Sequence, residues 1–239
     1  MPKGSPLSSR RGGIALNKLI ETKSLYSCTL PYLAPLFEKC NYPWQILPLI
    51  GDYVKKLVEE GIEGFERVSD TVLAGRDVKF YPTATIEGYA VIGRGSVVRP
   101  GAFIRGNVIT GQDCVIGNSS ELKNCILLNK VQIPHYNYVG DSVLGNFSHL
   151  GAGSICSNLK NDGKTVVIHA ESDYDTRLRK VGAFLGDGAN VGSGCVLNPG
   201  TVIGRETSVY PVNTLRGVYP ENAIVKDGGR VFPRLEKNS

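Results

Sequence analysis

An apolar residue recurs at every sixth position along much of this 239-residue chain, and this period constrains the fold more than any other feature. The first run extends over residues 80–134, a second over 144–156 and a third over 185–209. A period of six matches neither an α-helix, which repeats every 3.6 residues, nor a strand whose faces alternate. It matches a coil of three short strands, each of which buries one aliphatic side chain.

One such coil cannot bury its apolar face alone, so successive coils must stack and form parallel sheets. About eighteen hexapeptides give about six coils of three strands. The 29 glycines, about 12% of the chain against a usual ~7%, suit corners that need positive φ or close approach. The sequence therefore predicts an all-β parallel β-helix over residues 75–225 rather than a β-sandwich, with these test positions inside: Ile92, Val98, Val191 and Val209.

The part of the chain before the repeat favours helices. Residues 43–61 carry apolar side chains at helical spacing and end in a glycine, and residues 31–39 predict a shorter helix. We expect residues 14–74 to form a short helical segment that packs on the first coils. Residues 1–13 and 226–239 are predicted to be tails, the first of them flexible.

A break in the repeat at 157–184 predicts an insertion loop on one face of the solenoid, where binding sites often lie. Its turn at 161–163 and its several basic side chains are compatible with a solvated loop or with contact to phosphate.

The charge and cysteine patterns exclude several classes of protein. The net charge is +5 without long Lys/Arg runs, which argues against a nucleic-acid partner. No apolar run reaches the ~18 residues of a membrane span. The six cysteines form no CxxC pair, so neither a zinc site nor a disulfide framework is expected. Free, buried thiols in a reducing, cytoplasmic location are the expectation.

Histidine is the usual general base near neutral pH, and the chain has only His135, His149 and His169. His135 follows a proline that interrupts the inward pattern and lies among polar and aromatic neighbours. From residue type alone, a structural role and a catalytic role for His135 both remain open.

Four stretches carry a resemblance to a known family: RPGAFIRGN at 99–107, SSELKN at 119–124, PHYNYVGDSVLGNFSHLGAGSICSNL at 134–159 and KVGAFLGDGANVGSGCVLNPGTVIG at 180–204. The chain resembles the hexapeptide-repeat acyltransferase superfamily over residues 75–225. Within it, the chain is most similar to the acetyltransferase domain of bifunctional N-acetylglucosamine-1-phosphate uridylyltransferase/glucosamine-1-phosphate acetyltransferases, including archaeal-type sugar-phosphate nucleotidylyltransferases. The resemblance implies a left-handed β-helix and a homotrimer with sites between subunits.

The resemblance also implies roles for individual residues. His135 matches the family's base, Glu121 matches the glutamate that orients it, and Asn158 matches a third catalytic position. Positions that match substrate-binding residues are Arg99, Lys123, Tyr138 and Lys164. Ala152 and Ser193 match positions that contact acetyl-CoA, the expected co-substrate, and no metal is expected.

Three positions depart from the family pattern: Leu159 replaces a tyrosine, His149 a sugar-contacting asparagine and Pro134 a glycine. They leave the acceptor open. The sequence therefore predicts an acyltransferase that moves an acetyl or longer acyl group from CoA to a sugar phosphate or sugar nucleotide, with glucosamine-1-phosphate as one possible type of acceptor.

Two alternatives come from other classes. A γ-class carbonic anhydrase needs three zinc-binding histidines with an H-x4-H pair, and the histidine spacing here does not provide it. A non-catalytic β-helix scaffold or regulatory subunit is the second alternative, against which the joint presence of the matched site residues argues.

Overall fold

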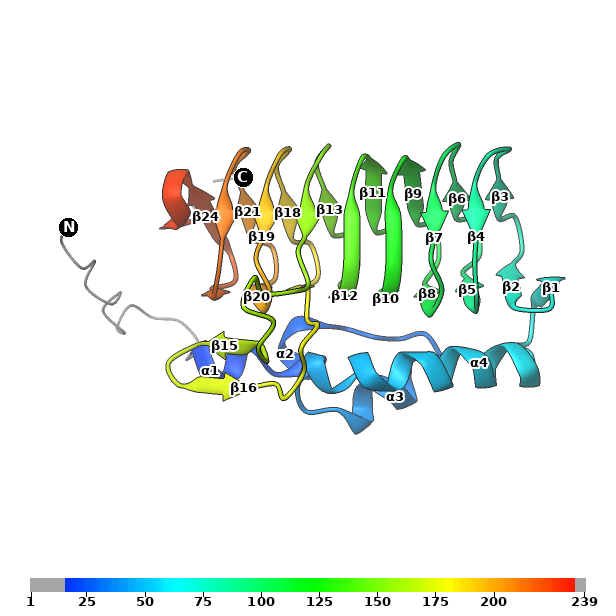
Figure 1. The fold of residues 1–239 in the computed structure, drawn as a ribbon, viewed down its shortest axis with the longest axis horizontal. Helices are drawn as coiled ribbons and strands as arrows, with labels where there is room; N and C mark the ends of the chain where they lie inside the picture. The colour runs from blue at the N-terminus through cyan, green and yellow to red at the C-terminus, as the bar shows by residue number, and fades with distance from the viewer. Residues whose placement is uncertain (1–15, 235–239) are drawn as a thin grey trace, which may run out of the picture.

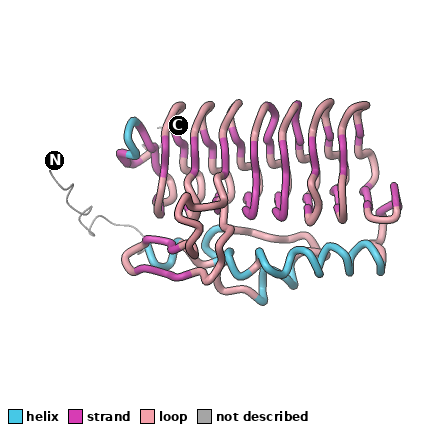
Figure 2. Tube along the Cα trace, in the orientation of Figure 1, coloured by secondary structure: helices cyan, strands magenta, loops and turns pink. Residues whose placement is uncertain are grey.

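Short parallel strands wind around one axis and form a three-sided, left-handed β-helix (Figure 1). The computed structural model describes residues 16–234, so the tail predicted at 1–13 lies outside the described residues. Figure 2 shows strands alternating with tight turns along the whole solenoid, while the helices, apart from a short helical turn near the C-terminus, lie in one layer beside it. The predicted fold class is confirmed.

The three faces of the β-helix are stacks of parallel strands, with one antiparallel strand, β25 (Arg230–Pro233), at the C-terminal end of the second face. The first, which we call the helix-covered face, contains β2 (Val72–Gly75), β5 (Ala90–Ile92), β8 (Val108–Thr110), the second halves of β10 (Glu121–Leu127) and β12 (Tyr138–Leu144), β17 (Ala183–Leu185), β20 (Thr201–Ile203) and β23 (Val218–Tyr219). The nine-stranded face contains β3 (Lys79–Phe80), β6 (Val97–Val98), β9 (Val115–Asn118), β11 (Gln132–His135), β13 (His149–Leu150), β18 (Asn190–Val191), β21 (Ser208–Val209), β24 (Ala223–Lys226) and β25 (Arg230–Pro233). The third face contains β4 (Thr85–Ile86), β7 (Phe103–Ile104), the first halves of β10 and β12, β14 (Ile155–Cys156), β19 (Val196–Leu197) and β22 (Thr214–Leu215).

The strand register explains both the six-residue period and its slip. Val108 pairs with Ala90, which lies eighteen residues before it. Cys125 pairs with Val108, which lies only seventeen residues before it. This shorter coil moves the frame by one residue. The inward positions are therefore Leu127 and Ile133, and not Leu128 and Pro134 as the six-residue frame predicted. The stack is also taller than the predicted six coils, because eight strands lie on the helix-covered face.

Residues with positive φ form the corners between faces. One such column contains Ser119, Tyr136, Gly153, Gly194 and Val212, one residue from each of successive coils. Other glycines serve close approach between coils. A Cβ on Gly117 would overlap the carbonyl oxygen of Pro134 in the next coil. The excess of glycine thus has the two causes expected from the sequence.

The solenoid interior is a continuous apolar core. The test positions are all buried, with Ile92, Val98 and Val191 at 0% exposure and Val209 at 3%. All six cysteines are free, and Cys28 is the one that is not fully buried. Each fully buried aliphatic side chain contributes roughly 1.5–3 kcal/mol, so the column of inward residues carries much of the stability.

A helical layer covers the outer surface of the first face (Figures 1 and 2). It consists of α1 (Leu16–Leu19), α2 (Thr22–Leu25), α3 (Ala34–Lys39), the 3-10 turns η1 (Pro43–Gln45) and η2 (Leu47–Leu49), and α4 (Ile50–Glu60). The outward residues Val91, Ile109 and Val143 are buried beneath it. Strands on this face are therefore apolar on both sides, as is usual for covered parallel sheets.

The insertion leaves the corner between the third face and the helix-covered face. It contains an antiparallel hairpin of β15 (Val167–His169) and β16 (Asp173–Asp175). Tyr174 of the hairpin contacts the rings of Tyr42 and Trp44, with centroid separations of 5.6 and 6.1 Å. The helical layer therefore fixes the position of the insertion.

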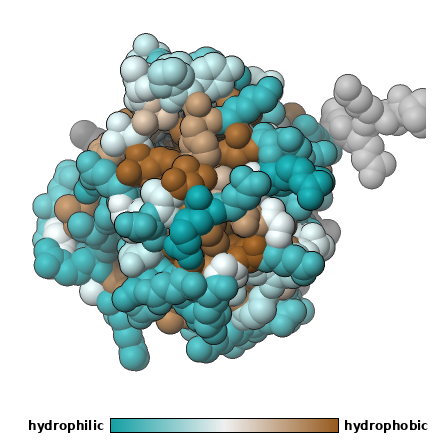
Figure 3. All heavy atoms as spheres, turned by 90° about the vertical axis from the view of Figure 1, so that its right-hand side faces the viewer, coloured by the Kyte–Doolittle hydropathy of each residue, from teal (hydrophilic) through white to brown (hydrophobic). Residues whose placement is uncertain are grey.

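The two ends of the solenoid differ. At the first end, β1 (Phe65–Ser69) pairs antiparallel with β2, and Figure 3 shows apolar side chains gathered at the centre of this end within a hydrophilic rim. At the other end, the turn η3 (Asp227–Gly229) and β25 fold back on β24. The predicted tail at 226–239 is thus partly an ordered strand. Within residues 16–234, no helix has the length and apolarity needed to cross a membrane.

Candidate functional site

His135 lies at the corner where the nine-stranded face meets the third face, at the end of β11. The N–H of Gly153 donates to the His135 carbonyl at 3.0 Å, and the N–H of Gly194 donates to the Ala152 carbonyl at 2.8 Å. These hydrogen bonds place His135, Ala152 and Ser193 in one column on three successive coils. The predicted base and the two predicted CoA contacts, far apart in sequence, are therefore neighbours on one corner.

A buried asparagine fixes the backbone at this corner. Asn137 accepts a hydrogen bond from the His135 N–H at 3.1 Å and donates to the Gly151 carbonyl at 2.8 Å. It also donates to the Ser154 carbonyl at 3.2 Å. The corner is thus held rigidly, while the imidazole above it stays exposed.

The His135 ring is not held as we expected from the resemblance. It makes no hydrogen bond with any residue in the described range, and Glu121 instead forms an ion pair with Arg105. Because side chains two residues apart in adjacent coils lie diagonally across one face, Arg105 is the nearer partner for this carboxylate. The expectation that Glu121 or a backbone carbonyl orients His135 is therefore wrong within one chain.

Asp141 binds two predicted site residues at the opposite corner of the third face. Its buried carboxylate accepts a hydrogen bond from Asn158 Nδ2 at 2.5 Å and lies 3.5 Å from Lys123 Nζ. Asn124 Nδ2 donates to its other oxygen at 2.9 Å. A buried carboxylate requires such partners, because an unpaired charge there would be costly. Asp141 therefore fixes Lys123 and Asn158.

Tyr138 completes this group, which we call the Asp141 cluster: Lys123, Asn124, Tyr138, Asp141 and Asn158. Asn158 Nδ2 donates to Tyr138 Oη at 3.2 Å. Burial raises the pKa of Tyr138, and the charges of Glu121 and Asp141 raise it further. The phenol therefore stays protonated at neutral pH and keeps a hydrogen to donate. A Cβ on Gly140 would lie 2.5 Å from Tyr138 Oη and 2.7 Å from Asn158 Nδ2, so a residue without Cβ makes room for this contact.

The two remaining predicted binding residues lie apart from the Asp141 cluster. Arg99 directly follows β6. The strand register aligns it with Pro134, the neighbour of His135, two coils further along. Two coils correspond to about 10 Å at the usual strand spacing. Lys164 lies exposed in the insertion, where its backbone N–H donates to Asp162. We expected Arg99 and Lys123 to converge on one groove; they instead lie at different corners of the third face.

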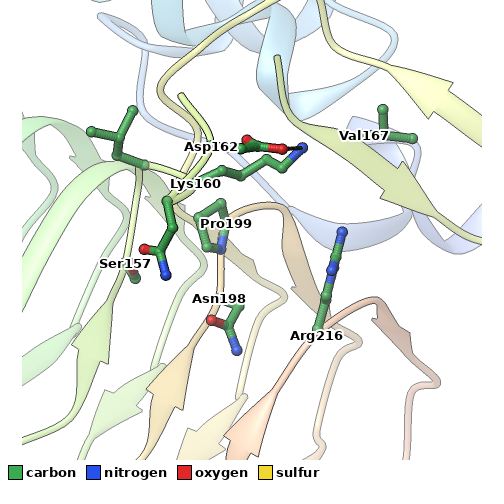
Figure 4. Close-up of a pocket in the computed structure, with 9 residues that line it drawn as sticks. Ser157, Lys160, Asp162, Val167, Asn198, Pro199 and Arg216 are labelled. Carbon is green, nitrogen blue, oxygen red and sulfur yellow. Dashed lines mark ion pairs between the residues drawn. The ribbon is translucent and has the colours of Figure 1, made fainter. Parts of the chain in front are cut away.

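A pocket of about 320 Å³ opens beside the Asp141 cluster, between the third face and the insertion (Figure 4). Its lining comes from both parts of the chain: Ser157, Leu159, Lys160, Asn161, Asp162, Val167, Asn198, Pro199 and Arg216. Leu159, one of the departures from the family pattern, lines this pocket. His149, another departure, lies on the nine-stranded face, with its ring 3.0 Å from the Asn190 side-chain oxygen.

The described part of the chain holds no group of three or more His, Cys, Asp or Glu side chains placed to bind a metal ion. His169 lies in the hairpin beside Asp173 and Arg216, and His135 lies at the corner described above. The three histidines therefore do not meet.

Comparison with known proteins finds relatives over most of the chain. The family described as the GMPPB C-terminal domain matches residues 86–173. The bifunctional protein GlmU of Methanococcus vannielii is 31% identical over 210 residues, which are 85% of this chain and 50% of that protein. The chain is a hexapeptide-repeat relative of GlmU. It spans about half the length of the GlmU proteins that it matches.

Another relative has a more explicit name. A bifunctional sugar-1-phosphate nucleotidylyltransferase/acetyltransferase of Sulfurisphaera tokodaii is 34% identical over 113 residues, 47% of this chain and 28% of that protein. Among solved structures, an Arabidopsis UDP-N-acetylglucosamine acyltransferase has a TM-score of 0.43 at 14% identity, covering 68% of this chain and 63% of that one. A Caulobacter crescentus perosamine N-acetyltransferase has a TM-score of 0.37 at 16% identity, covering 68% and 56%. Structural similarity this low says nothing about the ligands of this chain.

Two positions in these clusters, Asp141 and Arg216, are not among the site residues predicted from the sequence. Asp141 follows a glycine directly after an apolar stretch, and its position at a buried corner shows only in the fold. Arg216 lies 59 residues beyond Ser157 in sequence, yet both line the pocket. Only the coil register, which pairs β14 with β19 and β19 with β22, brings them together.

Proposed function

We propose that this chain is a CoA-dependent acyltransferase that acetylates an amine of a sugar phosphate or sugar nucleotide. The observation that carries the proposal is the corner column of His135, Ala152 and Ser193, because it aligns an exposed candidate base with two predicted CoA-contact positions. The similarity to GlmU and to a named sugar-1-phosphate nucleotidylyltransferase/acetyltransferase supports it.

The chemistry needs a base, a donor for the oxyanion and a way to place the acceptor. His135 takes the proton of the attacking amine, since both of its ring nitrogens are free of hydrogen bonds to the described residues. The amine attacks the thioester carbonyl and forms the C–N bond, the C–S bond breaks, and the proton taken by His135 passes to the sulfur, so CoA leaves as the thiol. Both amide hydrogens of Asn158 are donated to Asp141 and Tyr138, so its side-chain oxygen is the candidate group to position the acceptor amine.

The small side chains of Ala152 and Ser193 suit a CoA-binding position. Both are exposed at the corner, so an extended pantetheine arm can lie along the column without obstruction. Lys123, Arg99 and Lys164 supply positive charge around the third face for acceptor phosphate. Tyr138 donates its phenolic hydrogen to the acceptor.

We further propose a homotrimer in the cytoplasm. Six residues separate His135 from Asp141, about 20 Å of extended chain. A second subunit that presents its Asp141 cluster to the His135 of the first would close this gap. Sedimentation of the purified protein tests the trimer, and fractionation of expressing cells tests the location.

The direct test is a matrix of acyl donors and acceptors, with released CoA measured by thiol titration. Acetyl-CoA and longer acyl-CoAs are combined with glucosamine-1-phosphate and with amino-sugar nucleotides. Turnover with any pair supports the proposal and identifies the acceptor. If no pair reacts and CoA does not raise the melting temperature, the non-catalytic scaffold is the better interpretation.

A further inference from the structure

Three polar side chains form the floor of the insertion pocket. Ser157, Asn198 and Arg216 each follow directly after a strand of the third face, namely β14, β19 and β22. The register of these strands places them on successive coils, about 4.8 Å apart. A hydroxyl, an amide and a guanidinium therefore follow one another along one edge of the pocket, and Asn198 Nδ2 donates one hydrogen to the Leu215 carbonyl at 3.0 Å (Figure 4).

The guanidinium of Arg216 is held in place from the insertion side. Its Nη2 lies 3.2 Å from His169 Nε2, and His169 Nδ1 lies 2.7 Å from Asp173 Oδ1. In the tautomer with hydrogen on Nδ1, the ring donates to Asp173 and accepts from Arg216, so every partner is satisfied. Four of the five N–H donors of Arg216 make no hydrogen bond within the described part of the chain.

A second cation lies on the opposite wall. Lys160 Nζ is 3.4 Å from Asp162 Oδ2 and donates to the Thr165 carbonyl at 3.4 Å. Figure 4 shows Lys160 extending above Pro199, with Arg216 to the right of Pro199 and Asn198. Among the lining residues, two cations face a single carboxylate, an excess of one positive charge, while Asp173 lies behind His169. Leu159, Val167 and Pro199 supply apolar walls. Because apolar walls exclude water, they strengthen the attraction between this positive charge and an anion.

We infer that this pocket binds a phosphoryl group, with Arg216 as its main contact and Lys160, Asn198 and Ser157 as further donors. Arginine suits this role because its planar fork binds phosphate oxygens in pairs. The volume of about 320 Å³ is at the lower limit for ligand pockets and suits a diphosphate. The inference rests on the proposed function only for the source of the phosphate, which is either the acceptor or CoA.

The first experiment measures binding of inorganic pyrophosphate by calorimetry to the whole chain and to Arg216→Gln. We expect the dissociation constant to rise at least about fivefold in the variant, since one charge-assisted contact is lost. The control is Arg76→Gln, which removes the same charge from an exposed arginine after β2 that makes no side-chain hydrogen bond or ion pair in the described region. Asn198→Asp, which adds a negative charge to the floor, should weaken binding as well.

The second experiment repeats the titrations with CoA and with uridine diphosphate, and the ligand that Arg216→Gln weakens identifies the source. The inference is overturned if pyrophosphate binds Arg216→Gln and the unchanged chain equally, if Arg76→Gln loses as much affinity, or if neither CoA nor uridine diphosphate is affected.

The acyl-transfer assay separates this inference from the proposed function. If Arg216→Gln and the unchanged chain turn over with the same KM values, the inferred phosphoryl site is refuted and the proposed function is retained. If no acceptor is turned over but Arg216→Gln selectively loses pyrophosphate and nucleotide binding, the phosphoryl site is retained and the proposed function is refuted. Thermal unfolding of each variant confirms that it is folded.

Discussion

At the residue scale, the third face separates two kinds of side chain. His135 is exposed and unpaired within residues 16–234, whereas the buried carboxylate of Asp141 holds Lys123 and Asn158, and Asn158 in turn donates to Tyr138. A base must exchange protons freely, and groups that place a substrate must not move. The contrast in hydrogen bonding therefore matches the roles that we propose for the two corners.

Replacing His135 with Ala removes the base but leaves the corner backbone, which Asn137 holds. We expect turnover to fall by roughly 10²–10⁴-fold, the usual contribution of general acid–base catalysis, with CoA affinity unchanged. Released CoA and calorimetry are the measurements. The control is Gln132→Ala, an exposed residue on the same strand. Full activity of His135→Ala on a true acceptor would show that the imidazole is structural.

Val212 is a strained residue at the same corner, because a β-branched side chain rarely adopts positive φ. Its φ is 59° and its side chain is 83% exposed, so it gains little from packing. Val212→Asn should raise the free energy of unfolding by about 0.5–1.5 kcal/mol, since asparagine tolerates this conformation. Urea unfolding measures the change. Val68→Asn, at an exposed strand position, should give no such gain, and equal gains would refute the strain argument.

At the scale of elements, the sequence predicted the faces better than the irregularities. The six-residue period predicted the buried columns at Ile92 and Val191, because each coil repeats one inward position per strand. The seventeen-residue coil after Val108 was not predictable. The strand beyond the shortened corner is apolar on both of its sides, so the sequence does not show which of its residues point inward. The partner of Glu121 was missed for a related reason: register determines which coil neighbour is nearest.

The helical layer is the element whose contribution to stability is easiest to test. Trp44 is 5% exposed, stacks on Tyr42 at 4.6 Å between ring centroids, and lies 6.4 Å from Phe184 of β17. Trp44→Ala should lower the free energy of unfolding by about 3–5 kcal/mol, because it leaves a cavity between the layer and the β-helix. Denaturant unfolding is the measurement, and Val68→Ala, an exposed truncation, is the control. A loss below 1 kcal/mol would mean that the layer does not unfold with the solenoid.

At the scale of the whole molecule, buried thiols link stability to pH. Burial raises the pKa of Cys114 and of Cys156 to about 12, against 9.0 for an exposed thiol. The folded state therefore keeps protons that the unfolded chain loses above pH 9. This stabilisation is complete below pH 9 and is lost as pH rises through 9 to about 12. In that range each thiol should lower the free energy of unfolding by up to about 1.4 kcal/mol per pH unit.

Urea unfolding at pH 8, 9 and 10 measures this slope. The double variant Cys114→Ala, Cys156→Ala lacks both thiols, so its stability should fall less steeply above pH 9, whatever its stability at pH 8. Equal slopes for the variant and the unchanged chain would contradict the assignment to these two residues.

The proposed assembly predicts that two inactive chains can restore each other. His135 and the Asp141 cluster lie at opposite corners of the third face, so a complete site needs His135 of one subunit and Asn158 of another. His135→Ala and Asn158→Ala chains should each be inactive alone. Unfolded together in equal amounts and refolded, they form mixed trimers in which about one interface in four carries both intact residues. Released CoA should then recover to about a quarter of the unchanged activity. Mixing the folded variants without exchange is the control, and refolded mixtures that stay inactive would place the whole site within one chain.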